Sequence, residues 1–344
     1  MQIKLNFKPK TVTKGLLAEL HDRARDVIER RYGLLNSGTE RMTLEAIGEI
    51  YGITRERVRQ IENTALETVR KSKAYKNTAP AIDELEDAMI SFGGIVREGD
   101  FLGALAKDVS TQNHIHFLLV IGDPFIKIKE DDDFHHRWTV DPELSEKVHE
   151  ALRRLYKNLD EKDLITETEM IFKFIDHLKD TVEEVKDEEM AKRYLRISKR
   201  VRENRLGDWG LSHSPNIKTR GMRDMAYLIL KKKGSPLHFT DVAKMIAKEF
   251  GRKAHVATTH NELIKDKRFV LVGRGLYALS EWGYSSGVVR DVIREVIKKN
   301  GPLSKNDVVS HVLKQRHVKE NTIYVNLQNS NYFKKDTAGK YSIA

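Results

Sequence analysis

Residues 42–62 constrain the fold of this chain more than any other segment, because two helical apolar patterns flank a glycine there. Gly48 lets two helices approach closely, and Gly52 permits the positive φ of a tight turn between helices. Thr43 and Thr54 are the expected N-caps of the two short helices. The buried side of the two helices would consist of apolar residues at helical spacing, namely Leu44, Ile47, Ile50, Ile53, Val58 and Ile61. The segment therefore predicts a helix-turn-helix.

The second helix of this pair carries polar side chains that suit the edges of DNA bases. In a major groove, arginine pairs with guanine, glutamine pairs with adenine, and glutamate accepts from the cytosine amino group. The alternative interpretation is an amphipathic helix whose charged face is only solvated. Because the turn, the caps and the polar face coincide, we favour DNA recognition. The predicted base contacts lie opposite the apolar face and are Arg55, Glu56, Arg59 and Gln60.

The same segment resembles region four of bacterial sigma factors. The resemblance is carried by Thr54-Arg-Glu-Arg-Val-Arg-Gln-Ile-Glu62, by Thr43-Leu-Glu-Ala-Ile-Gly48 and by Arg30-Arg-Tyr-Gly33, and it covers roughly residues 13–73. It implies a domain that binds the promoter −35 element and the flap of RNA polymerase. It also implies that the four residues above contact bases. The phosphate contacts that we expect in addition are Arg23, Arg31, Thr54 and Arg57.

Two features depart from the family pattern. Thr64 and Glu67 occupy positions that are usually basic in the family, so the attraction to phosphates should be weaker. The segment Leu34 to Met42 is also slightly longer than the usual connection. Nothing in the chain resembles the sigma region that melts the −10 element. We therefore expect a regulator or polymerase accessory factor rather than a stand-alone sigma factor.

The distribution of charge indicates which parts of the chain suit a polyanion. Lysine and arginine number 61 against 51 acidic residues, which gives a net charge of +10. Residues 1–80 carry a net charge of +6, residues 81–190 carry −15, and residues 191–344 carry +19. Both ends therefore suit a nucleic acid, whereas the middle is expected to face solvent or a basic protein surface.

Several classes of protein are disfavoured by what the sequence lacks. The absence of cysteine excludes disulfides and thiolate zinc sites and suits a reducing cytoplasm. The first ten residues hold no apolar stretch of signal-peptide length, and no run predicts a membrane span. Neither GxxxxGK[ST] nor HExxH occurs. We expect a cytoplasmic non-enzyme without cofactor or metal that binds double-stranded DNA and RNA polymerase; its oligomeric state stays open.

A divergent repeat follows the helix-turn-helix. Each unit ends in a short strand with an aromatic residue, and the aromatic residues are separated by 71, 68 and 64 residues. The last two units show helical patterns followed by two strands around a glycine turn, which is the order of a winged helix. We predict a mainly α-helical chain with small β-hairpins. Its domains would be a helix-turn-helix at 1–79 and winged-helix units at 80–141, 142–217, 218–284 and 285–344.

The unit at 218–284 resembles the HARE-HTH winged helix, which occurs in the delta subunit of bacterial RNA polymerase and in some chromatin and restriction proteins. Pro236-Leu-His-Phe-Thr-Asp-Val242, Arg268-Phe-Val270 and the closing aromatic strand carry this resemblance. Winged helices serve either as DNA-binding or as protein-docking modules, and the sequence leaves both open. The candidate secondary DNA contacts are Lys253, His255, Thr258, Thr259 and Arg274.

Other candidate sites have a simpler structural interpretation. The segment Asp131 to His136 lies between two predicted strands and is expected to be a solvated wing tip rather than a metal site. His255 and His260 are five residues apart, which does not suit a same-face metal pair, so surface or phosphate-facing roles are expected. The strand aromatics Trp138, Trp209 and Tyr277 are expected to be core anchors rather than base-stacking platforms.

The basic run from Lys192 to Arg202 has two interpretations. It is either the third helix of its winged unit with a charged outer face or a helix that tracks phosphates. A further alternative for the whole chain is the DNA-targeting part of a restriction system, which rests on fold analogy alone.

Overall fold

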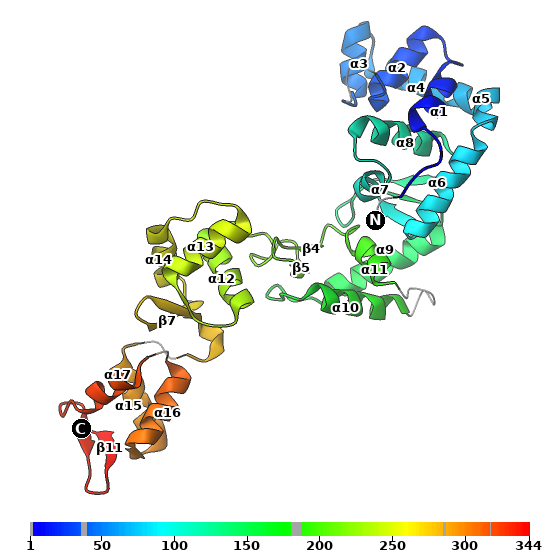
Figure 1. The fold of residues 1–344 in the computed structure, drawn as a ribbon. Helices are drawn as coiled ribbons and strands as arrows, with labels where there is room; N and C mark the ends of the chain where they lie inside the picture. Colours follow the sequence, from blue (N-terminus) through cyan, green and yellow to red (C-terminus); the bar gives the residue numbers. More distant parts are fainter. Residues whose placement is uncertain (1–2, 36–39, 180–186, 285–286, 317) are drawn as a thin grey trace. The chain divides into compact units, whose positions relative to one another are not determined.

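The structure is a computed structural model that describes residues 3–35, 40–179, 187–284, 287–316 and 318–344. It is mainly α-helical with small antiparallel sheets (Figure 1), which confirms the predicted fold class. The chain forms two compact units. The first comprises Met1–Arg202 and Trp209–Ser212, and the second comprises Glu203–Asp208 and His213–Ala344.

The first unit begins with five helices: α1 (Pro9–Leu17), α2 (Asp22–Tyr32), α3 (Leu44–Tyr51), α4 (Arg55–Lys71) and α5 (Lys73–Lys76). The predicted turn and caps are confirmed. Gly52 has φ +63°, and the hydroxyls of Thr43 and Thr54 accept from backbone amides at 3.2 Å. A Cβ on Gly48 would lie 2.6 Å from the carbonyl oxygen of Ile53, which explains the need for glycine.

Helix α4 is 17 residues long, so the prediction of a short second helix is wrong. Its buried stripe continues past Val58 through Ala65 and Val69. These later residues belong to a hydrophobic core that also includes residues beyond the helix-turn-helix. The extra length therefore follows from packing against a segment that lies later in the sequence.

That later segment forms a winged helix: α6 (Ala79–Phe92), β1 (Ile95–Arg97), α7 (Glu98–Leu105), α8 (Val109–Ile121), β2 (Ile126–Ile128) and β3 (Arg137–Thr139). Helix α8 packs against α1, α2 and α4. The Tyr32 ring meets the Phe117 ring edge-on at 5.3 Å, and the Asn113 side chain donates to the carbonyl of Gly33 at 3.0 Å. The helix-turn-helix therefore shares one core with the winged helix that follows it.

The segment between β2 and β3 is anchored at one residue and is not solvated throughout. Asp131 and Asp132 are exposed, as predicted for a wing tip, whereas Asp133 is half-buried and Phe134 is 1% exposed. Phe134 forms a β-bridge with Ser198, which belongs to the next winged unit of the same compact unit. The prediction of a solvated wing tip is therefore wrong at this aromatic residue.

The next winged unit repeats this order with α9 (Pro142–Lys157), α10 (Glu167–Lys179), α11 (Glu188–Leu195), β4 (Val201–Glu203) and β5 (Trp209–Leu211). The predicted single basic helix from Lys192 to Arg202 is wrong, because α11 ends at Leu195 and a strand begins at Val201. Its apolar residues Tyr194, Leu195, Ile197 and Val201 are all buried. The basic residues are thus divided among the end of the third helix, a turn and a strand, and they do not form one helical face.

The second compact unit contains two further winged helices. One comprises α12 (Met222–Lys233), β6 (Leu237–His238), α13 (Phe239–Phe250), α14 (Val256–Lys265), β7 (Phe269–Gly273) and β8 (Leu276–Leu279), followed by the short helix η1 (Ser280–Trp282). The other comprises α15 (Val289–Asn300), β9 (Leu303–Ser304), α16 (Lys305–Gln315), α17 (Glu320–Leu327), β10 (Phe333–Lys335) and β11 (Lys340–Ile343). Their sheets have the equivalent orders β6-β8-β7 and β10-β11-β9.

The aromatic residues of the sequence repeat occupy one structural position. Each pairs with an apolar residue that precedes the second helix of its unit: Trp138 with Val96, Trp209 with Ile165, Tyr277 with Leu237, and Tyr341 with Leu303. Trp138, Trp209 and Tyr277 are at most 3% exposed, which confirms their prediction as core anchors. The domain boundaries drawn from this repeat remain a prediction.

Candidate nucleic-acid interface

The first half of α4 presents the four predicted base contacts to solvent. Arg55, Glu56, Arg59 and Gln60 are all exposed, whereas Val58 between them is fully buried. Val58 packs with Val27 of α2 and Ile47 of α3 in a small core beneath the turn. The helix-turn-helix core therefore fixes which face of α4 points outward.

These side chains are paired with one another or with α3. Arg59 donates to both carboxylate oxygens of Glu56 at 2.9 and 2.7 Å, and this contact lowers the pKa of Glu56. Arg57 Nη1 donates to Gln60 Oε1 at 3.0 Å. Arg55 Nε lies 3.0 Å from Glu45 Oε1 of α3. Because exposed ion pairs are weak in water, these pairings leave the groups available to an outside partner.

A groove of about 540 Å³ runs beside this face, between the α1–α2 connection and α4. Three predicted contacts line it, namely Arg23, Arg57 and Gln60. His21 and Thr68 also line it, and the sequence did not predict them because they lie outside the three motifs that carry the family resemblance. The Arg23 guanidinium lies 5.2 Å from the centre of the Tyr51 ring. Two arginines at one groove suit a phosphate next to the predicted base-contacting face.

Arg31 is engaged inside the domain. Its Nη1 donates to the carbonyl of Met42 at 2.9 Å, and its Nε lies 3.4 Å from the buried carboxylate of Glu62. Glu62 also accepts from the hydroxyl of Tyr32 at 2.9 Å. Arg31 would therefore have to give up its contacts with Met42 and Glu62 before it could bind a phosphate. Thr54 caps α4 through an oxygen lone pair, so its hydroxyl hydrogen stays available to a phosphate.

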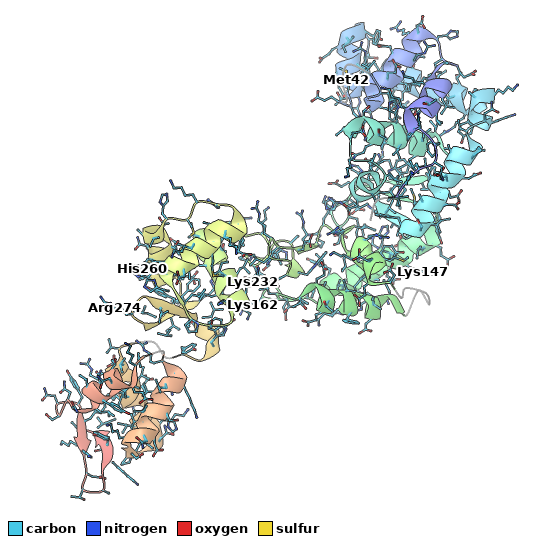
Figure 2. The ribbon with its side chains drawn as sticks, viewed as in Figure 1. Met42, Lys147, Lys162, Lys232, His260 and Arg274 are labelled. Atoms are coloured by element: carbon cyan, nitrogen blue, oxygen red, sulfur yellow. The ribbon has the colours of Figure 1, made fainter. Side chains whose placement is uncertain are left out.

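The candidate contacts of the third winged unit divide into exposed and buried residues. Lys253, His255 and Thr258 are exposed around the start of α14, and Arg274 is exposed between β7 and β8 (Figure 2). Thr259 is wrong as a DNA contact, because it is fully buried and its hydroxyl donates to the carbonyl of His255 at 3.0 Å.

His260, which lies on α14, also departs from its prediction. The His260 ring stacks on the Phe239 ring at 4.2 Å and meets the Tyr277 ring edge-on at 5.8 Å. It thus belongs to an aromatic cluster and is half-buried, so it is not a free surface residue. Across the described residues, no group of three or more histidine, aspartate or glutamate side chains is arranged to hold a metal ion.

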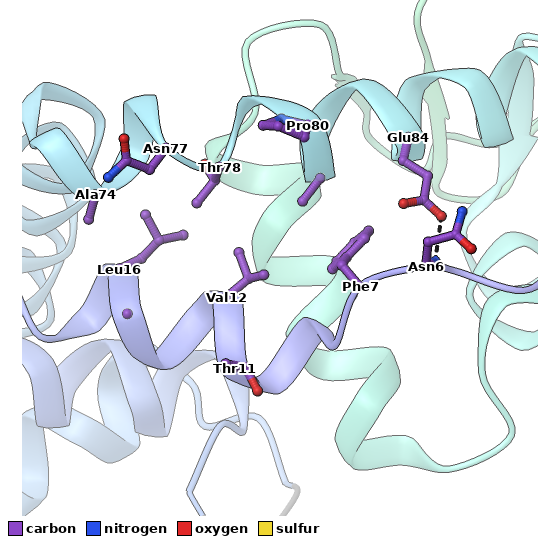
Figure 3. A pocket seen from close by; sticks show the side chains of 12 residues that line it. Asn6, Phe7, Thr11, Val12, Leu16, Ala74, Asn77, Thr78, Pro80 and Glu84 are labelled. Atoms are coloured by element: carbon purple, nitrogen blue, oxygen red, sulfur yellow. Dashed lines mark hydrogen bonds between the residues drawn. The ribbon is translucent and has the colours of Figure 1, made fainter.

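A cavity of about 590 Å³ lies between the start of the chain and the α5–α6 junction (Figure 3). Phe7, Val12 and Leu16 face Ala74 and Pro80 across it. Its lining includes the carboxylate of Glu84, which accepts from the backbone amide of Asn6 at 2.6 Å. The lining is mainly apolar and brings no second acid or base next to this carboxylate.

No helix among the described residues is long and apolar enough to cross a membrane.

Comparison with known families confirms both sequence resemblances. Residues 16–71 match the model of Sigma-70, region 4. Residues 220–282 match the HARE-HTH model, whose description names ASXL and a restriction endonuclease HTH domain. Both are helix-turn-helix domains and not enzyme families. The matched domains indicate a DNA-binding function related to transcription.

Similar curated proteins match the first of these regions. RNA polymerase sigma factor SigA1 of Synechococcus elongatus is 49% identical over 57 residues, which are 17% of this chain and 14% of that protein. RNA polymerase sigma factor RpoD of Helicobacter pylori is 44% identical over 61 residues, or 18% and 9%. RNA polymerase sigma factor RpoS of Coxiella burnetii is 50% identical over 54 residues, or 16% and 15%. The chain thus spans at most 15% of these relatives.

Proposed function

We propose that this chain is a sequence-specific DNA-binding transcription factor that recognises a −35-like promoter element in association with RNA polymerase. The observation that supports this most is the exposed face of α4 within the matched segment 16–71. Arg55, Glu56, Arg59 and Gln60 would contact bases there. The three relatives similar to this segment are named as RNA polymerase sigma factors, which favours the same partner here.

The neighbouring groups would orient the domain on the duplex. Arg23 and Arg57 line a groove beside the base-contacting face, and Thr54 stands at the start of α4. Contacts of this kind fix register and orientation without reading sequence. The described part of the chain beyond residue 71 would act in regulation rather than in promoter melting.

Selection of bound duplexes from a random pool tests the proposal directly. Enrichment of a TTGACA-like sequence is the expected result. Arg59→Ala should then weaken binding to the selected duplex by roughly 5- to 150-fold and relax the preference at one base pair. Fluorescence anisotropy with selected and scrambled duplexes measures both effects. If the Arg59→Ala protein preferred the selected duplex over the scrambled duplex as strongly as the parent does, Arg59 would not contact a base.

A second candidate function is a polymerase-associated scaffold that acts through protein contacts. It is favoured by the net charge of −15 over residues 81–190, which suits a basic protein surface. Salt dependence separates the two candidates. A DNA-binding factor loses duplex affinity steeply as salt rises, with a slope near 0.9 per phosphate neutralised. A scaffold shows little duplex affinity even in dilute buffer.

A further inference from the structure

The C-terminal winged helix, α15 to β11, lies outside both matched families. It can be compared residue by residue with the HARE-HTH unit. Thr259 and Leu263 are buried in α14, and Ile323 and Leu327 are buried at the same places in α17.

The hairpins of the two units share one register. Phe269 pairs with Leu279 in the HARE-HTH unit, and Phe333 pairs with Ile343 in the C-terminal unit. Counting inward from these pairs brings Gly275 and Gly339 to the same position of the turn, and both have a positive φ. The strands of the two units can therefore be compared position by position.

The two hairpins differ sharply in charge. In this register the HARE-HTH unit has Val270, Leu271 and Leu276 where the C-terminal unit has Lys334, Lys335 and Lys340. All three lysines are exposed. The apolar strands of one winged helix are thus replaced by a basic wing in the other.

The geometry of the hairpin keeps these lysines on the surface. Lys334 pairs with Ser342, and Lys335 pairs with Tyr341. Because residues alternate along a strand, Lys334 and Lys340 share one face of the hairpin. The Lys335 ammonium lies over the Tyr341 ring at 6.0 Å from its centre. Asp336 also lies in this hairpin, and its carboxylate accepts from the backbone amide of Lys340 at 2.8 Å.

Helix α17 presents a polar face in the same unit. Asn321 and Thr322 on α17 and Gln328 directly after its end are exposed, and amide and hydroxyl groups of this kind can donate to and accept from base edges. Val325 is 63% exposed and would suit a thymine methyl. Glu320 is an acidic residue at the start of the helix, and its carboxylate accepts from the hydroxyl of Tyr324 at 3.1 Å.

We propose that the C-terminal winged helix is a second duplex-DNA-binding module, in which α17 enters a major groove and Lys334, Lys335 and Lys340 contact neighbouring phosphates. Duplex DNA is favoured over duplex RNA because the major groove of A-form RNA is too narrow for a helix. This module acts independently of the base contacts assigned to α4. It gives the chain a second attachment to the template.

The test uses the full-length chain with its lysines replaced by glutamine at positions 334, 335 and 340. The matched control carries Lys298→Gln, Lys299→Gln and Lys314→Gln, which removes the same charge from exposed positions on α15 and α16. Binding to a random duplex is measured by fluorescence anisotropy over a series of salt concentrations. The wing variant should lower the salt slope by about 2 to 3, and the control should lower it by less than about 1.

Equal slopes for the two variants would overturn the proposal. Duplex RNA that competes as well as duplex DNA would overturn the choice of partner. Arg59→Ala separates this inference from the proposed function, because it alters preference among duplexes while leaving the effect of the wing lysines in place. If α4 does not read DNA, Arg59→Ala has no effect and the wing variant still loses salt-dependent binding. Equal thermal midpoints of the two lysine variants show that both are folded.

Discussion

Gly48 illustrates how one residue fixes the helix-turn-helix. It lies within α3 with helical backbone, so alanine would normally be the better helix former. The carbonyl of Ile53 nevertheless occupies the space where a Cβ would stand, at 2.6 Å. The turn therefore folds back so closely on α3 that only hydrogen fits. Because the neighbouring atom belongs to the backbone, no change of side-chain rotamer could make room for a Cβ.

Gly48→Ala should lower the free energy of unfolding by about 1–3 kcal/mol, because the added methyl overpacks against backbone. Gly15→Ala in α1 is the matched control, since in the described part of the chain no heavy atom outside its own helix lies within 4 Å of the added Cβ. That control should gain about 0.5–1 kcal/mol from helix propensity. Urea denaturation measures both. A Gly48→Ala protein as stable as the parent would contradict the close approach of the turn.

His114 is a buried residue that couples stability to pH. It lies on α8, is 2% exposed, and neither ring nitrogen has a hydrogen-bond partner among the described residues. Burial lowers its pKa below the ordinary value of 6.5, as do Lys10 and Lys14, whereas Asp108 acts in the opposite direction. The unfolded chain therefore takes up a proton at a higher pH than the folded chain does. Stability from this residue is present above about pH 6.5 and is lost as pH falls below it.

We expect His114→Leu to reduce the loss of stability between about pH 7 and pH 5. The matched control is His21→Leu, which removes an exposed histidine instead of a buried one. Urea denaturation at the two pH values gives the comparison. If His114→Leu retains the parental slope, protonation of this histidine does not contribute to acid sensitivity.

At the scale of elements, α3 and α4 depend on their caps. Each helix is preceded by a threonine whose hydroxyl accepts from the backbone amide of the third helical residue at 3.2 Å. Two such bonds, together with Gly52 in the left-handed conformation, define where the turn begins and ends. The side chains of Arg55 and Glu56 are placed on the first turn of α4 by the second cap.

Thr43→Ala and Thr54→Ala should each lower the free energy of unfolding by about 0.5–2 kcal/mol. Thr54→Ala should also weaken DNA binding if its hydroxyl donates to a phosphate, whereas Thr43→Ala should not. Thr54→Ser keeps the cap and the donor and should restore both properties. Denaturation and duplex binding are measured on the same samples. Loss of DNA binding in the Thr43→Ala protein would mean that the effect comes from stability alone.

At the scale of the first compact unit, the helix-turn-helix is bound to the winged helix by a buried polar network as well as by the shared core. Burial would raise the pKa of Glu98, but hydrogen bonds from His116 and Lys127 lower it far below its usual range. Trp138 Nε1 donates to the same carboxylate at 2.8 Å, and Arg41 lies 3.7 Å from it. Arg41 thus links the connection before α3 to the winged helix. The exposed polar face of α4 is held on a folded body larger than the matched segment.

The sequence predicted those parts of the molecule that depend on local patterns. Period-3.6 burial, threonine caps and the glycine turn defined α3 and the start of α4, although Ile50 of the predicted buried face is 51% exposed. The spacing of Trp138, Trp209, Tyr277 and Tyr341 revealed the repeat. It failed where a local pattern was ambiguous. Thr259 looks like a surface residue in sequence and is buried, and the basic run from Lys192 contains a helix end that no proline or glycine marks.

By itself, the sequence determined the helix-turn-helix, its outward polar face on α4 and the winged-helix order, because these follow from contacts between residues close in the chain. Only the tertiary structure decided that α8 completes the core of the N-terminal helices, that Glu62 engages Arg31, and that α4 extends to Lys71. These features depend on residues far apart in sequence. Their side chains acquire partners only when folding removes the intervening water, and no spacing rule encodes that partnership.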